Sequence, residues 1–125
     1  MNEIKLEVKI KKEDINKDIY FLDNEYDSLE ELNELNTELL INNKKYKYSK
    51  CFKPEKEGIY EIKIKFNIKI KNCCHMFHGC SNLININLSS FDTKNVINMN
   101  HMFHGCSNLI NINLSSFDTK NVTNM

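Results

Sequence analysis

The 125-residue sequence predicts an α+β fold, in which a small, mainly antiparallel β cap at residues 1–70 is followed by a short solenoid at residues 71–125. Two observations support this prediction. Alternating apolar and charged residues in the first part are typical of half-buried strands, and a 26-residue sequence period in the second part is typical of stacked repeat units. A chain of this length forms about one domain, so a large multidomain enzyme is excluded.

The strands expected in the cap follow from period-two alternation. Residues 4–10 place Ile, Leu, Val and Ile at every second position with Lys and Glu between them, and residues 62–70 repeat the pattern. A further strand is predicted at residues 19–22, where apolar and aromatic residues are concentrated. The last strand leads directly into the first repeat, so this region is expected to cover the apolar edge of the repeats as an N-terminal cap.

Two other local signals lie in the cap. The Asn42-Asn43 pair separates residues 39–41 from residues 46–48 and predicts a β-hairpin. Ser28 and Glu31 have the spacing of a capping box and are followed by Leu32 and Leu35, which predicts a short helix.

The internal repeat is nearly perfect. Residues 75–99 return 26 positions later as residues 101–125, and only Ile97 against Thr123 differs. The sequence therefore predicts two units, at residues 75–100 and 101–125. The second unit stops one residue short of the period and no polar terminal unit follows, whereas about three units are usually needed for an independent core. We therefore expect an array truncated at its C-terminus, with an uncapped edge available for self-association.

Each unit contains an L-x-x-I-x-L string, which runs from Leu83 to Leu88 in the first unit and is the strand signature of a leucine-rich repeat. Ile and Leu are expected to point inward and the two intervening Asn outward. Residues 98–104 are expected to form a short helix or helical turn. Gly105 after it, and Gly79 at the equivalent position one unit earlier, are expected in left-handed conformation. The remaining inward set is Phe91, Val96, Met99, Met102, Phe103, Cys106 and Leu109.

The motif Met-Phe-x-Gly-Cys-Ser-x-Leu-x-x-Ile-x-Leu-Ser-Ser-Phe-Asp-Thr-x-x-Val-x-Asn-Met, read from Met76 and again from Met102, resembles the BspA-like leucine-rich-repeat surface proteins. The resemblance covers about the last two fifths of the chain, from about Ile70 onward. It implies a non-enzymatic, surface-presented module for protein–protein interaction in adhesion, with no catalytic residues to carry over. The alternative is an intracellular repeat scaffold.

Composition limits the partners. The 17 Lys and 17 acidic residues cancel, and Arg is absent, so phosphate handling and nucleic-acid binding are disfavoured. In fact 15 Lys and 15 acids lie in residues 1–71, which leaves the repeats nearly uncharged. No apolar stretch approaches the roughly 18 residues of a membrane span, so no membrane insertion is expected. Localisation stays open, because the missing signal peptide and five unpaired cysteines favour the cytoplasm while the resemblance implies the cell surface.

The candidate partner-binding residues are the outward amides Asn85, Asn87, Asn111 and Asn113, which stacking would place side by side on one strand surface for an unidentified protein partner. Alternatively, these four amides bind no partner: they are solvated and form amide ladders that stabilise the stacking of the units. No cofactor and no enzymatic activity are expected.

The alternative metal ligands are the repeated imidazoles His75, His78, His101 and His104, which stacking would bring about 5 Å apart and which could bind Zn²⁺. Duplication of the unit by itself accounts for the repeated histidines. In addition, Cys80 and Cys106 are expected to face inward, away from the imidazoles, whereas a structural zinc needs four ligands that converge on one point. Nucleophilic catalysis by Cys beside His is disfavoured, since no group in the motif orients a base.

Overall fold

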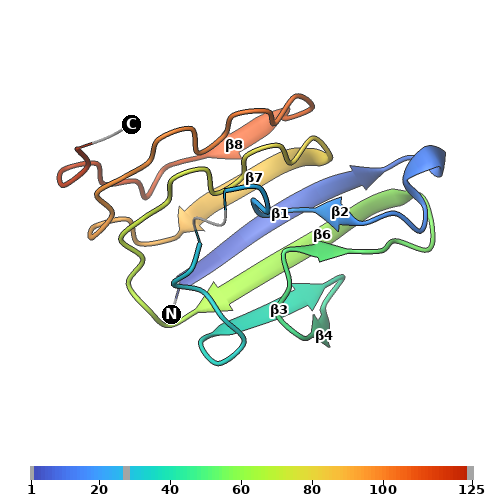
Figure 1. The fold of residues 1–125 in the computed structure, drawn as a ribbon, viewed down its shortest axis with the longest axis horizontal. Coiled ribbons are helices and arrows are strands. Elements are labelled where there is room, and N and C mark those ends of the chain that lie inside the picture. The colour runs from blue at the N-terminus through green and yellow to red at the C-terminus, as the bar shows by residue number, and fades with distance from the viewer. Residues whose placement is uncertain (1, 27–28, 124–125) are drawn as a thin grey trace.

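The structure, a computed structural model, describes residues 2–26 and 29–123. It forms a six-stranded mixed sheet in the order β4-β3-β6-β1-β7-β8 and a two-stranded sheet of β2 and β5 (Figure 1). The strands are β1 (Asn2–Ile10), β2 (Ile19–Tyr20), β3 (Thr37–Ile41), β4 (Lys44–Tyr46), β5 (Cys51–Phe52), β6 (Gly58–Phe66), β7 (Leu83–Ser90) and β8 (Asn111–Asn113), with one 3-10 turn, η1 (Lys12–Asp14).

The fold class predicted from the sequence, α+β with a leucine-rich-repeat solenoid, is wrong. The described residues contain no α-helix, and the strands of both repeat units join the same sheet as the strands of the cap. The strand that connects the two parts of the sheet is β1, which pairs antiparallel with β6 on one side and antiparallel with β7 on the other. Beyond β7 the sheet continues by parallel pairing to β8, where Ile86 lies opposite Ile112.

Of the short helix or helical turn predicted at residues 98–104, only turns are present, and no helix forms there. His101 has a left-handed φ of 53°, which interrupts a right-handed helix. Backbone N–H groups of residues 73–79 instead bond to carbonyls 25 positions later. The donors Cys73, His75, Phe77 and Gly79 reach the carbonyls of Asn98, Asn100, Met102 and His104 at 2.8–2.9 Å. These four carbonyls therefore bond to residues 73–79 instead of to their own turn.

The predicted helix after Ser28 is also wrong. Ser28 itself lies outside the described residues, and residues 29–36 form turns. The Glu31 carboxylate, which a capping box would use locally, accepts the backbone N–H groups of Lys71 and Asn72 at 3.1–3.2 Å. Glu31 thus binds the start of the repeat region, about 40 residues away in sequence.

The predicted strands and hairpin are largely confirmed. Residues 4–10 lie in β1 with alternate side chains buried, while the strand expected at 62–70 ends at Phe66. Asn42 and Asn43 have φ of 51° and 66°, the geometry of a two-residue hairpin turn. That short turn sets Lys44 opposite Ile41, so β4 begins two residues before the position predicted.

The core lies on one face of the large sheet. Inward residues of β1, β3, β6 and β7 share one apolar cluster with Phe21, Leu22, Leu29 and Leu32. Figure 1 shows β2 and the segment beside it crossing this face. Within the described ranges, no helix could cross a lipid bilayer.

Candidate functional site

The side of the six-stranded sheet that faces away from the core carries a regular array of polar side chains. Because successive side chains of a strand alternate between faces, burial of Ile4, Leu6 and Val8 turns the residues between them outward. We call this surface the outward face; it comprises Glu3, Lys5, Glu7, Lys9, Glu61, Lys63, Lys65, Asn85, Asn87, Asn111 and Asn113, all half-buried or exposed.

The four predicted amides meet on this face in two adjacent pairs. Asn85 lies opposite Asn111 and Asn87 opposite Asn113 in the parallel pairing of β7 with β8. Asn85 Nδ2 donates to Glu7 Oε1 at 2.7 Å, so one amide is bound to the neighbouring strand. Asn87 and Asn113 accept the N–H of the residue two positions onward, at 3.0 Å in both units.

Charged rows, which the sequence did not reveal, extend the amide pairs across the sheet. Lys5 stands opposite Lys63 and also opposite Asn87, while Glu7 stands opposite Glu61 and also opposite Asn85. A lysine row and a glutamate row therefore lie side by side, each ending in two amides. Among the described residues, the charges of these rows form ion pairs only within a strand, between Lys63 and Glu61 at 3.5 Å and between Lys5 and Glu3 at 4.0 Å. The strand register needed to find these rows could not be read from composition.

The four repeated imidazoles also come together, on the turn side of the units. His75 and His101 have ring centroids 5.2 Å apart, as do His78 and His104, whose rings are stacked with an interplanar angle of 16°. Within a unit, the ring centroids of His75 and His78 are 5.5 Å apart, and those of His101 and His104 are 5.6 Å apart. The spacing agrees with the stacking expected from the repeat.

A short turn from the cap closes over these imidazoles. Tyr26 stacks on His75 with a centroid distance of 4.1 Å and meets His78 edge-on at 4.9 Å. The fully buried Asp23 holds this turn by accepting the N–H groups of Glu25 and Tyr26 at 3.1 Å. No periodicity or motif in the sequence pointed to Asp23 or Tyr26 as neighbours of the repeats.

The four imidazoles and the Tyr26 ring pack against one another as a cluster of rings. Nδ1 of His78 is buried without a hydrogen-bond partner, 3.9 Å from Asp23 and 3.6 Å from Glu25. Within the described ranges, no group of three or more His, Cys, Asp or Glu residues is disposed to hold a metal ion.

The thiols near the imidazoles are not activated. Cys74 Sγ lies 2.8 Å from His75 Nδ1, but burial and the Asp23 charge raise the pKa of the Cys74 thiol above its ordinary value. Burial likewise raises the pKa of Cys106 to about 11 and that of Cys73 to about 12. These thiols are protonated at neutral pH, whereas a nucleophilic cysteine needs a lowered pKa.

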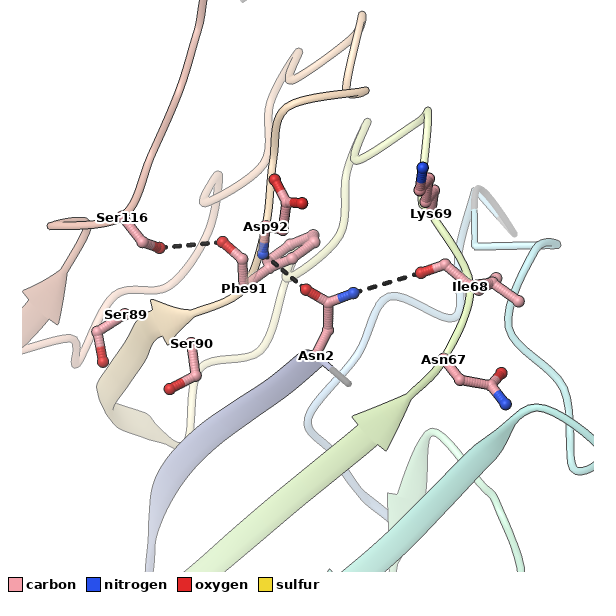
Figure 2. Close-up of a pocket in the computed structure, with 9 residues that line it drawn as sticks. All are labelled: Asn2, Asn67, Ile68, Lys69, Ser89, Ser90, Phe91, Asp92 and Ser116. Carbon is pink, nitrogen blue, oxygen red and sulfur yellow. Dashed lines mark hydrogen bonds between the residues drawn. The ribbon is translucent and has the colours of Figure 1, made fainter.

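A hollow of about 590 Å³ lies at the start of β1, between the segments that follow β6 and β7 (Figure 2). Two of its polar side chains, those of Asn2 and Ser116, are hydrogen-bonded to neighbouring backbone groups. Asn2 accepts the N–H of Asp92 at 2.7 Å and donates to the carbonyl of Ile68, while Ser116 donates to the carbonyls of Leu88 and Phe91. Asn2 and Ser116 thus tie neighbouring segments together.

Comparisons with known proteins give one result. A family model described as "Mycoplasma protein of unknown function, DUF285" matches residues 46–125, from the end of β4 through both repeat units. No curated protein and no solved structure matches the chain.

Proposed function

The chain belongs to the DUF285 family of Mycoplasma proteins of unknown function, and from this premise we propose that it is a non-enzymatic protein-binding module. The outward face is its contact surface, with the lysine and glutamate rows and the adjoining amides Asn85, Asn87, Asn111 and Asn113 as the contacting groups. The resemblance of the repeats to BspA-like surface proteins leads us to infer that this binding serves adhesion.

The observation that carries the proposal is the pairing of like charges across two adjacent strands. Directly opposite like charges destabilise a sheet by roughly 0.2–1 kcal/mol per pair. The face holds two such pairs, Lys5 with Lys63 and Glu7 with Glu61, although exchanging one Lys and one Glu would remove both repulsions. A surface that retains this cost is explained by a partner that supplies the opposite charges.

The spacing of the rows defines the complementary partner. Residues two apart on a strand are separated by about 6.7 Å, so the rows lie at about that distance. An extended segment crossing the strands over the lysine row would place carboxylates there, and a neighbouring segment would place cations over the glutamate row. Electrostatic complementarity of this kind fixes register and raises the association rate.

The test uses charge-neutralising variants of the face with matched controls. Lys5→Gln and Glu7→Gln each remove one member of a like-charge pair, and Lys17→Gln and Glu55→Gln remove the same charges from exposed positions elsewhere. A photo-crosslinking residue at the exposed Asn111, with Asn24 as the control position, captures proteins from cells that express the chain.

We expect both face variants to be as stable as the unaltered protein, or more stable by roughly 0.2–1 kcal/mol, and to lose a protein that Asn111 captures. The control variants should retain it. Capture that is unchanged by Lys5→Gln and Glu7→Gln would contradict the proposal, as would loss of stability in these variants. Localisation of the full-length product then distinguishes adhesion at the surface from an intracellular scaffold.

A further inference from the structure

The core side of the six-stranded sheet is open at β4, the strand at one edge of the sheet in Figure 1. Lys44 lies opposite Ile41 and Tyr46 opposite Leu39. Residues directly opposite each other on paired strands face the same side, so Lys44 and Tyr46 face the core side. Ile41 and Leu39 are at most 6% exposed, whereas Lys44 is exposed and Tyr46 is 39% exposed. The layer that covers β3 therefore does not close over β4.

A cavity of about 460 Å³ lies at this opening, lined by β3 and β4 on one side and by β5 and residues 53–56 on the other. Buried residues of β3 give it an apolar floor that is continuous with the core. The rings of Phe52 and Tyr60, 5.2 Å apart, and the partly exposed ring of Tyr46 give it aromatic walls. Sites for small molecules commonly have volumes of about 300–1,000 Å³ and a mainly apolar lining with a few polar groups.

The rim of this cavity is positively charged, although the whole chain is neutral. The charged residues that line it are Lys44, Lys47, Lys53, Lys56 and Glu55, all exposed. Lys47 forms an ion pair with Glu34 at 3.3 Å, but within the described part of the chain the other three lysines have no carboxylate at ion-pair distance. Three ammonium groups around a partly enclosed apolar space attract an anion.

The wall that carries Lys53 and Lys56 is held in place by two contacts. The Tyr60 hydroxyl donates to the carbonyl of Lys56 at 2.8 Å and accepts its N–H at 3.3 Å. The carbonyl of the buried Pro54 accepts the N–H of Asn16 at 2.8 Å. A wall that is already ordered loses less conformational entropy when a ligand binds.

Charge and aromatic surface adjoin in the cavity, since the Lys44 ammonium lies 5.8 Å from the centroid of the Tyr46 ring. A lysine ammonium is a point charge without the fork of arginine, so it attracts carboxylates and phosphates alike. An exposed tyrosine ring stacks on flat apolar groups.

We propose that this cavity binds a small organic anion that has a flat apolar body and two or more negative charges. The body lies against Tyr46, and the charges lie at Lys44, Lys53 and Lys56. Because these side chains are on the core side of the sheet or beyond it, binding here is separate from the protein contact at the outward face.

Four probes separate the parts of this ligand. ADP carries an aromatic body and a diphosphate, adenosine carries the body alone, and pyrophosphate carries the charge alone. Phthalate, an aromatic ring with two carboxylates, tests whether carboxylates serve in place of phosphates. In isothermal titration calorimetry of the intact chain, ADP or phthalate should bind about tenfold or more tightly than both adenosine and pyrophosphate.

Cys51, a half-buried thiol in the lining of the cavity, reports where the probe binds. A bound probe should slow alkylation of Cys51 by an uncharged reagent. Alkylation of Cys106, which is also half-buried but lies in the second repeat unit, should not change.

Matched variants assign the binding to the rim and the ring. Lys53→Gln with Lys56→Gln should weaken binding about tenfold or more, and Tyr46→Ala should weaken binding of the aromatic probe about tenfold without affecting pyrophosphate. Lys94→Gln with Lys120→Gln removes the same charge from exposed positions in the repeats and should leave binding unchanged.

Circular dichroism of each variant confirms folding. The proposal is overturned if neither ADP nor phthalate binds more tightly than both adenosine and pyrophosphate. Binding that leaves Cys51 unprotected, or that the control lysine variant weakens as much as the rim variant does, would overturn it as well.

Discussion

Gly79 and Gly105 occupy equivalent positions in the two units and provide a sharp test of how the units contact each other. Both have left-handed φ, 72° and 82°, as expected from the sequence. A Cβ added at Gly79 meets nothing within 4 Å, whereas one added at Gly105 lies 3.1 Å from both N and Cα of Gly79. Those are backbone atoms, so they cannot rotate away.

The difference gives an expected order. Replacement by Ala imposes a left-handed penalty of about 1–2 kcal/mol at either site, partly offset by about 0.4–1 kcal/mol from the stiffer unfolded chain. Gly79→Ala should therefore cost about 1 kcal/mol. Gly105→Ala adds the displacement of a packed backbone, about 1–3 kcal/mol, for a total of about 2–4 kcal/mol.

Urea unfolding of both variants measures these free energies, and amide hydrogen exchange locates them. Because Phe77 and Gly79 donate to carbonyls of Met102 and His104, Gly105→Ala should speed exchange at these two amides more than Gly79→Ala does. Equal costs, or a larger cost for Gly79→Ala, would show that the backbones of the units do not approach each other as described.

Three further outcomes follow. Phe77→Ala should cost about 3–5 kcal/mol and Phe103→Ala about half of that, because Phe103 is only partly buried where it stacks on Phe77 at 5.8 Å; equal costs in urea unfolding would indicate a cover over the second unit. In native protein at about pH 8, a thiol reagent should modify the half-buried Cys51 well before Cys73, whose pKa burial raises to about 12, and denaturant should abolish the difference. Partial burial and the neighbouring imidazoles lower the pKa of His75 below its ordinary 6.5, so its protonation favours the unfolded chain. Stability from this group is present above pH 6.5 and is lost as the pH falls below it, so the melting temperature should drop on acidification, and less so in His75→Asn; an equal drop in both proteins would contradict this assignment.

Local patterns predicted local structure well. Alternation fixed which residues of β1 and β6 face the core, and the Asn42-Asn43 pair was sufficient for a hairpin turn because both residues tolerate positive φ. The repeat period correctly indicated that the imidazoles and amides of the two units would lie side by side.

What failed depended on contacts distant in sequence. The capping-box spacing correctly marked Glu31 as a hydrogen-bonding residue. Its carboxylate, however, accepts the backbone N–H groups of Lys71 and Asn72 instead of capping a local helix. The carbonyls of residues 98, 100, 102 and 104 bond to N–H groups of residues 73–79, which the local sequence could not indicate. The charged rows likewise require the register of β1 against β6 and β7, which joins residues up to about 90 positions apart.

The backbone bonds between the units also bear on how such a chain can change in length. The carbonyls of residues 98, 100, 102 and 104 accept the N–H groups of residues 73, 75, 77 and 79, so bonds form at every second residue between stretches that lie 25 positions apart. Loss or gain of a single residue would reverse this alternation for the rest of the unit. A further complete 26-residue copy inserted between Asn100 and His101 would instead meet matching donors on one side and matching acceptors on the other. Duplication of whole units is therefore the change in length that the fold tolerates best.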